Sequence, residues 1–523
     1  MQIRSRALCL TILGAVSCFS SLHAQKHPNS PVFKDYQTSP LTSFLERSDV
    51  TYQLWQGFML VREANGGDAL AQHELGIRYL TGRGFTADTT KGAYWIQKAA
   101  DQHLITARYN FGILLYNGWG VQWNPFDAYG NFRDCAEKKM PEAEFVLGQF
   151  YGDNLVVPRN WETAYAWVKG AADAGYEPAK EALPEFARRV PKQLLDSSST
   201  TTKRGSKDST SQSSAQALGL VFLDFDEDTT SRHADDLTLL KDLLRSGNED
   251  VRNVLGLSDT SNGKIDVDST GIQTILKAAE AGSPEALTIL GRCYEKGMGV
   301  KKNLVLAAST YVRAIRLDSP RASELLWKLF QEKQFADRIV KEATSDDPDA
   351  QYAWAGMLAL GFNPGMVHPE AQLTEEQALH MLESAADRNH PQAMVELGLC
   401  YYAGRWVHQD RGRALNLWRR AADRGSREAE LRLAVTSVRE DQDSATVHTS
   451  VAFLMHAALE GSVLAEVALA YCYKNGRGVG ENKGKAAKLY REGAQRGSQD
   501  AFRSLKRMHD EIRPEEEEFR ILN

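Results

Sequence analysis

A glycine-rich stretch near the C-terminus has the composition of a phosphate-binding loop. It runs Gly476-Arg477-Gly478-Val479-Gly480 and continues to Gly484-Lys485. A phosphate loop needs a fixed glycine spacing to its lysine, a Ser or Thr after that lysine, and a preceding strand. The spacing here differs, Ala486 follows the lysine, and no strand pattern precedes the stretch. We therefore interpret it as a turn between two helices.

Two acidic stretches resemble calcium-binding loops. In the first, Asp224, Asp226 and Asp228 alternate and Asp235 stands at the twelfth place, but Thr229 replaces the turn glycine that such loops require. In the second, residues 262–266, the glycine lies at the position of an inter-helix turn in the repeat described below. We expect neither stretch to bind a metal, and we expect no cofactor.

Catalytic motifs are absent from the sequence. It contains neither Gly-x-Ser-x-Gly nor His-Glu-x-x-His, the motifs of serine hydrolases and zinc proteases. The histidines His368, His380, His390 and His408 are scattered over turns and helix surfaces. We therefore predict no catalytic residue and a protein that is not an enzyme.

The dominant pattern of the sequence is a 36-residue period. It is visible in Gly76, Gly112 and Gly148, in Leu397, Leu433 and Leu469, and in Ala385, Ala421, Ala457 and Gly493. Self-similarity at a period of about 20–50 residues is typical of solenoids, in which each unit packs only on its neighbours. The sequence therefore predicts a solenoid.

Each unit reads as a pair of helices. In the clearest unit the first helix carries Ala286, Leu290 and Tyr294 at a spacing of four, Gly297 and Gly299 form the turn, and the second helix carries Ala307, Tyr311 and Ala314. Gly291 and its equivalents allow the paired helix to approach closely. A bulkier residue there is expected to overpack the interface at a cost of about 1–3 kcal/mol.

The unit resembles the Sel1-like repeat, a relative of the tetratricopeptide repeat. The residues that carry the resemblance in one unit are Ala71, Leu75, Gly76, Tyr79, Gly82, Gly84, Trp95, Ala99 and Ala100. It recurs from Ala393 and from Ala465, while the unit after Ser319 is about eight residues short and the unit from Asp349 has about seven residues in excess. The resemblance implies an all-α fold, an α/α superhelical solenoid of helix-turn-helix repeats.

Composition divides the chain into two arrays joined by a Ser/Thr-rich linker. The linker has almost no apolar residue and cannot recover its ordering entropy by burial. The predicted segments are a signal peptide (1–24), an N-terminal array (36–195) that a helix near Glu177–Leu195 closes, a disordered linker (196–217), a C-terminal array (234–513) and a solvated acidic tail (514–523).

The first 24 residues have the features of a secretory signal. Arg4 and Arg6 precede an apolar run, residues 7–16, that is too short to cross a bilayer, and Ala24 offers a small residue for cleavage. We expect an exported protein, periplasmic or extracellular, without a transmembrane segment. The alternative is a lipoprotein acylated at Cys18, although Ala15 fits a lipobox poorly.

Four cysteines remain after that signal: Cys135, Cys293, Cys400 and Cys472. The last three occupy equivalent positions in different units, much farther apart than the roughly 4–7 Å that a disulfide tolerates between Cα atoms. We expect four buried thiols. Some Sel1-like proteins have a cysteine pair in each repeat, and this chain departs from that pattern.

By similarity to tetratricopeptide repeats, a concave groove is lined by first-helix residues at fixed offsets from the leucine that recurs in each repeat. The candidate partner-binding residues are Ile77, Leu80, Tyr109, Ile113, Tyr116, Phe145, Val395, Leu399, Tyr402, Val435, Val438 and Tyr471. Most are apolar, and a contiguous apolar groove marks a binding surface. The alternative is that tight curvature buries them between neighbouring first helices.

The sequence and the resemblance together favour a non-enzymatic scaffold for protein or peptide partners. The formal net charge of -6, with both signs mixed along the chain, gives no basic surface for nucleic acid. Two rivals stay open: a cell-envelope enzyme or enzyme regulator that acts on cell-wall material, and a structural spacer. The partner, the pathway and the oligomeric state are not specified by the sequence.

Overall fold

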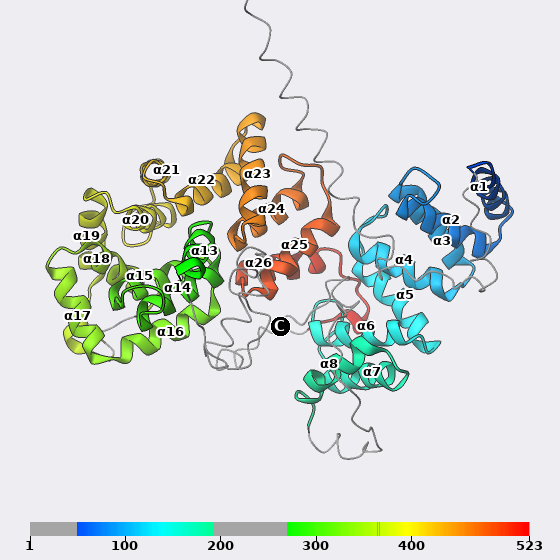
Figure 1. Cartoon of the computed structure of the whole chain (residues 1–523), viewed down its shortest axis with the longest axis horizontal. Coiled ribbons are helices and arrows are strands. Elements are labelled where there is room, and N and C mark those ends of the chain that lie inside the picture. Colours follow the sequence, from blue (N-terminus) through cyan, green and yellow to red (C-terminus); the bar gives the residue numbers. More distant parts are fainter. Residues whose placement is uncertain (1–49, 192–268, 363–364, 366, 522–523) are drawn as a thin grey trace, which may run out of the picture. The chain divides into compact units, whose positions relative to one another are not determined.

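The computed structural model describes residues 50–191, 269–362, 365 and 367–521 (Figure 1). Across these ranges the chain forms 22 α-helices, two short 3-10 helices and no strand, which confirms the predicted all-α solenoid. None of the helices in these ranges is long and apolar enough to cross a membrane. The predicted signal peptide, the linker and both acidic stretches lie outside the described residues.

The chain divides into two compact units. Met1–Val221 and Arg513–Asn523 form the first unit, and Phe222–Ile512 form the second. In the first unit each helix packs against the next one along the chain. Its described helices are α1 (Val50–Asn65), α2 (Ala69–Thr81), α3 (Thr89–Asp101), α4 (Ile105–Asn117), α5 (Pro125–Glu137), α6 (Pro141–Asp153), α7 (Trp161–Asp173) and α8 (Glu177–Ala187), followed near the chain end by the 3-10 helix η5 (Glu517–Phe519).

The second unit repeats the same helical hairpin, and two of its repeats differ in length. The repeat that is eight residues short is the pair α16–α17, whose helices are joined through Glu332 alone. The repeat with seven residues in excess is the pair α18–α19, which carries the 3-10 helix η4 in its loop. The described helices are α13 (Ser269–Glu280), α14 (Pro284–Lys296), α15 (Leu304–Arg316), α16 (Pro320–Gln331), α17 (Lys333–Thr344), α18 (Pro348–Ala359), η4 (Pro369–Ala371), α19 (Glu375–Asp387), α20 (Pro391–Ala403), α21 (Arg411–Ala422), α22 (Arg427–Glu440), α23 (Ser444–Leu459), α24 (Val463–Asn475), α25 (Lys483–Gln495) and α26 (Gln499–Asp510).

Polar caps and glycines set the ends of these helices. The second helix of most units begins after an Asn or Asp whose side chain accepts a hydrogen bond from the first turn, as at Asn160 and Asn482. The first helix of several units ends on a left-handed glycine, such as Gly404 with φ +71°. The recurring Gly-x-Gly turn therefore ends the first helix of these repeats, as the sequence predicts.

The glycine in the middle of the first helix lies where the paired helix crosses it. A Cβ at Gly148 would clash with Val168 Cγ2 and lie 3.0 Å from the carbonyl oxygen of Ala164 in α7. At Gly398 a Cβ would clash with the indole of Trp418, whose Nε1 donates to the carbonyl oxygen of Val395 at 3.1 Å. The close-approach role predicted for these glycines is confirmed.

Gly148→Ala is expected to destabilise the first unit by about 1–3 kcal/mol, because the added methyl group must push Val168 or the α7 backbone aside. Gly130→Ala in the neighbouring helix α5 is a matched control, since nothing lies within 4 Å of its Cβ position. That control is expected to be neutral or to stabilise by up to about 1 kcal/mol through helix propensity. Urea unfolding of both variants, followed by circular dichroism, checks this; equal midpoints would contradict the close-packing role.

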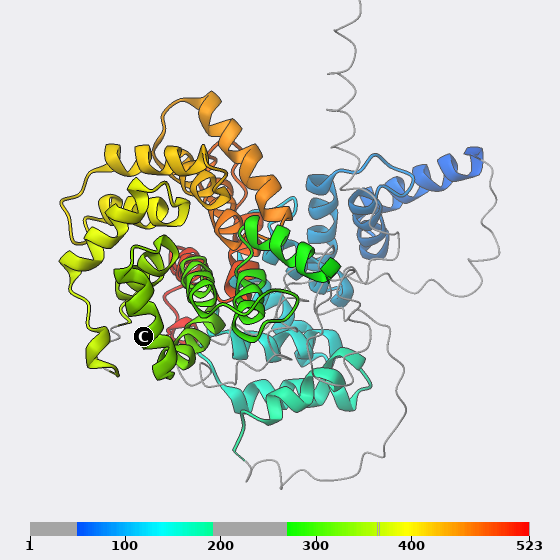
Figure 2. The same ribbon diagram turned by 60° about the vertical axis from the view of Figure 1, so that its left-hand side comes forward.

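The second unit curves until its first helices meet its last ones (Figure 2). Arg316 in α15 donates from Nε to Glu396 of α20 at 2.9 Å, and Arg432 of α22 donates to the carbonyl oxygen of Arg316 at 3.1 Å. Ser498, which caps α26, donates to Asp318 at 2.8 Å. These contacts span more than one repeat, so the unit is a tightly wound superhelix and not an open arc.

A buried ion cluster lies inside this superhelix. Arg496 donates to both oxygens of Glu285, at 2.9 and 2.8 Å, to Glu466 at 2.6 Å and to the carbonyl oxygen of Gly461 at 2.6 Å. Two carboxylates thus share one guanidinium. Burial raises the pKa of Glu466 to about 7, because Arg496 only partly compensates for the loss of water.

This raised pKa predicts a stability that falls as the pH rises. The folded chain binds a proton at Glu466 up to about pH 7, whereas the unfolded chain loses it near 4.5. The contribution is therefore fully present below about pH 4.5 and is lost as the pH approaches 7; the difference corresponds to at most about 3 kcal/mol. Glu466→Gln, a permanently neutral analogue, is expected to remove this dependence.

The measurement is urea unfolding of the second unit between pH 5 and pH 8. Glu481→Gln is the matched control, since this exposed glutamate lies in the same repeat outside the cluster. It should keep the pH dependence of the original chain. A Glu466→Gln chain with the original pH dependence would exclude Glu466 as its source.

Candidate functional site

The twelve predicted groove residues all lie on first helices, but most of them do not reach the surface. The buried ones, each at most 9% exposed, are Ile77, Tyr109, Ile113, Tyr116, Phe145, Val395, Val435 and Val438. The four that are partly exposed are Leu80, Leu399, Tyr402 and Tyr471. The described surface therefore offers no continuous groove made of these side chains.

The buried members of this set pack against neighbouring helices. The Tyr109 ring meets Phe132 of α5 edge-on at 5.5 Å, and the Tyr116 ring meets Phe150 of α6 at 5.7 Å. Burial also raises the pKa of Tyr109 well above its ordinary value. These contacts favour the packing alternative that the sequence leaves open, and partner binding by the twelve residues stays a prediction.

The partly exposed tyrosines lie among charged side chains. Tyr402 donates to Glu440 at 2.5 Å, and its ring centre lies 5.4 Å from that of Trp418 at an interplanar angle of 36°. Tyr471 lies under Arg439, whose guanidinium carbon is 5.7 Å from the ring centre. Tyr471 also lines a depression of about 330 Å³ with Arg439, Lys474, Asn475, Tyr490, Ser504 and Arg507. Around Tyr402 and Tyr471, the exposed part of the predicted groove is therefore aromatic and charged, and not apolar.

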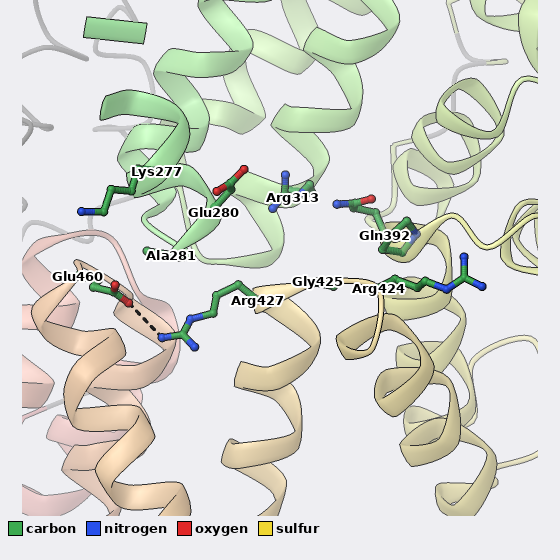
Figure 3. Close-up of a pocket in the computed structure, with 11 residues that line it drawn as sticks. Lys277, Glu280, Ala281, Arg313, Gln392, Arg424, Gly425, Arg427 and Glu460 are labelled. Carbon is green, nitrogen blue, oxygen red and sulfur yellow. Dashed lines mark hydrogen bonds and ion pairs between the residues drawn. The ribbon is translucent and has the colours of Figure 1, made fainter. Parts of the chain in front are cut away.

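A larger pocket, of about 400 Å³, opens on the second unit among the turns between repeats (Figure 3). It lies where the end of α13, the start of α20, the turn before α22 and the end of α23 converge. Its lining residues are Lys277, Glu280, Ala281, Arg313, Pro391, Gln392, Arg424, Gly425, Ser426, Arg427 and Glu460.

Among the residues that line this pocket, four cationic side chains outnumber two carboxylates. Arg427 donates to Glu460 at 3.1 Å and to Glu430 at 2.9 Å, and Arg313 Nε lies 3.7 Å from Glu428, which is outside the lining. The amide of Gln392 points into the opening toward Arg313, as Figure 3 shows. The exposed side chain of Arg424 lies at the rim. A pocket with this balance attracts carboxylate groups.

Helix termini add to this potential. Helices α20 and α22 begin at the pocket, where His390 and Ser426 cap them. The amino end of a helix carries a partial positive charge, and each of these ends lies beside arginine side chains. The arrangement can therefore bind the acidic side chains or the terminal carboxylate of a peptide.

Sequence reasoning missed this pocket. Arg424 lies in the turn before α22, outside the first-helix positions at which the candidate residues were predicted. The available signal was the density of arginine from Arg419 to Arg427 at one inter-repeat turn. That signal becomes a pocket only because the superhelix brings α13 and α20 to the same place.

The cysteines show no reactive character. Cys135, Cys293, Cys400 and Cys472 are all buried, as predicted. Burial raises the pKa of the Cys135 and Cys400 thiols to about 12 and that of Cys472 to about 11. A thiol with so high a pKa is a poor nucleophile at neutral pH.

Stacked helical hairpins with a 36-residue repeat define an α-helical repeat protein. Comparison with known families narrows this class. The Sel1 repeat matches residues 69–104, 141–176, 284–319, 348–390, 391–426 and 463–498. The chain therefore carries six Sel1 repeats, and proteins with such repeats are generally scaffolds for protein interaction.

Among curated proteins, the chain is similar to DAP3-binding cell death enhancer 1 of Rattus norvegicus, with 32% identity over 94 residues. It is also similar to the protein of that name in Mus musculus, with 26% identity over 167 residues. The matches cover 18% of this chain and 18% of the rat protein, and 25% of this chain and 32% of the mouse protein. The chain thus spans less than a third of either relative's length.

Two solved structures are similar to this chain at 20% identity. One is a protective antigen of uropathogenic Escherichia coli that displays an SLR fold, with a TM-score of 0.29 and coverage of 86% of this chain and 81% of that one. The other is a Sel1 repeat protein from Oxalobacter formigenes, with a TM-score of 0.22 and coverage of 94% and 99%.

Proposed function

We propose that the protein is an exported, non-enzymatic scaffold that binds acidic peptide segments of partner proteins. The observation that carries the proposal is the positive pocket among the repeat turns of the second unit, with Arg313, Arg424 and Arg427 in its wall. Peptides that carry carboxylates complement it in charge. The name of the curated relatives says that they bind DAP3, which supports a protein as the class of ligand.

Export is part of this proposal and rests on the sequence alone. The basic residues, the short apolar run and the small residue at Ala24 are the features of a cleaved signal. A periplasmic or extracellular location follows from them. N-terminal sequencing of the mature protein tests it: a start at Gln25 supports cleavage, and a start at Met1 overturns it.

A peptide library displayed on phage tests the binding function. We expect the full chain to enrich peptides that are rich in Asp and Glu. Arg424→Glu places a carboxylate at the pocket rim and should weaken binding of the enriched peptides about tenfold, since it removes one attraction and adds one repulsion. Turnover of cell-wall material by the pure chain would favour the rival enzyme function instead.

Arg420→Glu is the matched control for this experiment. Arg420 is exposed on α21, one helical turn before Arg424, and it does not line the pocket. The control makes the same change of charge and should leave affinity within about twofold. Equal losses from both variants, or peptides without acidic enrichment, would overturn the pocket as the binding site.

A further inference from the structure

The C-terminal residues pack on the first unit. Residues 513–523 belong to that unit, although the sequence predicts a solvated acidic tail there. Glu515, Glu516, Glu517 and Glu518 are all exposed. Glu518 and Phe519 nevertheless contact helix α5.

Glu518 is held by two side chains of α5. Arg133 donates from Nη1 to both carboxylate oxygens, at 2.8 and 2.9 Å, and a hydrogen bond between two charged groups is stronger than one between neutral groups. Tyr129 donates its hydroxyl proton to Glu518 at 2.8 Å. Tyr129 itself is buried, and its hydroxyl lies 3.0 Å from that of Tyr151, so the acceptor position for a carboxylate is fixed by the fold.

Phe519 and Arg513 complete the contact. The Phe519 ring meets Phe126 edge-on at 5.2 Å and Tyr129 at 5.9 Å. Arg513 donates to the carbonyl oxygens of Leu155 at 2.8 Å and of Val156 at 3.2 Å. The segment therefore contributes one cation, one carboxylate and one aromatic ring, and each has a matching partner.

The repeat pattern changes at this surface. The first two turns of the unit carry Gly82-Arg83-Gly84 and Gly118-Trp119-Gly120, and the third carries Asn154-Leu155-Val156. Leu155 is 0% and Val156 is 1% exposed, and Val156 stands where the equivalent turns have Gly84 and Gly120. The departure from the repeat coincides with the carbonyl oxygens that Arg513 contacts.

We propose that this surface, which we call the α5 site (Phe126, Tyr129, Arg133, Leu155 and Val156), is a receptor for a short acidic–aromatic segment of a partner protein, with Glu directly before Phe. Residues 513–519 of the chain occupy it until such a segment displaces them. The proposal does not depend on the pocket of the second unit.

The internal segment has the properties of a displaceable ligand. The Arg133–Glu518 pair is about 40% exposed on both sides, 41% and 39%, and an ion pair of this kind contributes only about 0–1 kcal/mol. The segment competes as a tethered ligand at an effective concentration of about 1 mM. A free peptide with a Kd of about 100 μM for the empty α5 site therefore binds the full chain about tenfold more weakly, because the tethered segment competes for the site.

The test uses a fluorescent peptide with the sequence of residues 513–523 and two proteins, the full chain and a chain that ends at Ile512. Fluorescence anisotropy is expected to show binding to the shortened chain about tenfold or more tighter than to the full chain. Absence of binding to the shortened chain, or equal affinity for both, overturns the proposal. A full chain that is dimeric and a shortened chain that is monomeric would assign the α5 site to the C-terminal segment of a second copy and overturn it as well.

Variants of the peptide locate the specificity. Glu518→Ala and Phe519→Ala peptides are expected to bind the shortened chain at least about tenfold more weakly, since each loses one of the two anchors. The Glu515→Ala peptide makes the same change of charge at an exposed residue and should bind within about twofold. An equal loss of affinity for the Glu515→Ala peptide would mean that only the net charge of the peptide determines binding, and it would overturn the proposal.

A charge swap tests the receptor side. Arg133→Glu in the shortened chain should abolish binding of the original peptide and restore it for the Glu518→Arg peptide. Arg188→Glu, at an exposed arginine of the first unit outside the α5 site, should change neither result. Arg424→Glu should also leave this binding intact, which separates failure here from failure of the proposed function. Unchanged binding by the Arg133→Glu chain overturns the proposal.

Discussion

Arg496→Met is expected to destabilise the second unit by about 3–5 kcal/mol at pH 8. The substitution keeps most of the buried volume but removes the guanidinium that Glu285 and Glu466 share. Removing one partner of a buried ion pair leaves the other charge without compensation, which costs more than the pair itself contributes. The loss should be smaller at pH 5, because Glu466 then carries a proton.

Urea unfolding read by hydrogen exchange in α14 and α24 measures this loss in the second unit itself. Arg503→Met is the matched control, since Arg503 is exposed on α26, and its effect should be within about 0.5 kcal/mol. The double variant Arg496→Met with Glu285→Leu should be more stable than Arg496→Met alone, because it removes one stranded charge. If Arg496→Met were as stable as the control, the cluster would not hold the superhelix closed.

Tyr109→Ala is expected to destabilise the first unit by about 3–5 kcal/mol. Tyr109 is only 7% exposed and its ring packs edge-on against Phe132, which is 0% exposed. Truncation of a buried aromatic ring loses its transfer free energy and leaves a cavity between α4 and α5 that neighbouring helices cannot fill. The expected effect is on stability, and peptide binding by the folded chain should be unchanged.

Tyr94→Ala is the control for this substitution. Tyr94 lies on α3 and is 52% exposed, so its truncation should cost less than about 1 kcal/mol. The comparison decides whether the twelve apolar and aromatic residues predicted on the first helices form a binding groove or pack between neighbouring helices. A stable Tyr109→Ala chain that no longer binds peptides would restore the groove and contradict the packing role that the structure assigns to Tyr109.

The fold was predictable because its main constraint is local and repeats. Glycine and alanine are needed where paired helices cross, so the 36-residue register of Gly76, Gly112 and Gly148 defines the hairpins directly. Irregular units are visible for the same reason. The short α16–α17 pair and the long α18–α19 loop both appear in the sequence as shifts of this register.

The binding surfaces were not predictable in the same way. A local period says nothing about how tightly the superhelix winds, and winding decides which first-helix residues are exposed. Val438 occupies a predicted groove position and is 0% exposed. Contacts between residues far apart in the sequence are not predicted by a local period either: Glu285 and Arg496 lie 211 residues apart, and Arg133 and Glu518 lie 385 apart.

The most direct test of the scaffold function is site-specific photo-crosslinking in the cell that produces the protein. Benzoylphenylalanine replaces Gln392, which points into the pocket of the second unit, and in a second chain it replaces Arg420 on the exposed side of α21. We predict a discrete light-dependent protein adduct from position 392 that Arg424→Glu abolishes, and no such adduct from position 420. The same adducts from both positions, or none from position 392, would contradict a peptide-binding role for this pocket.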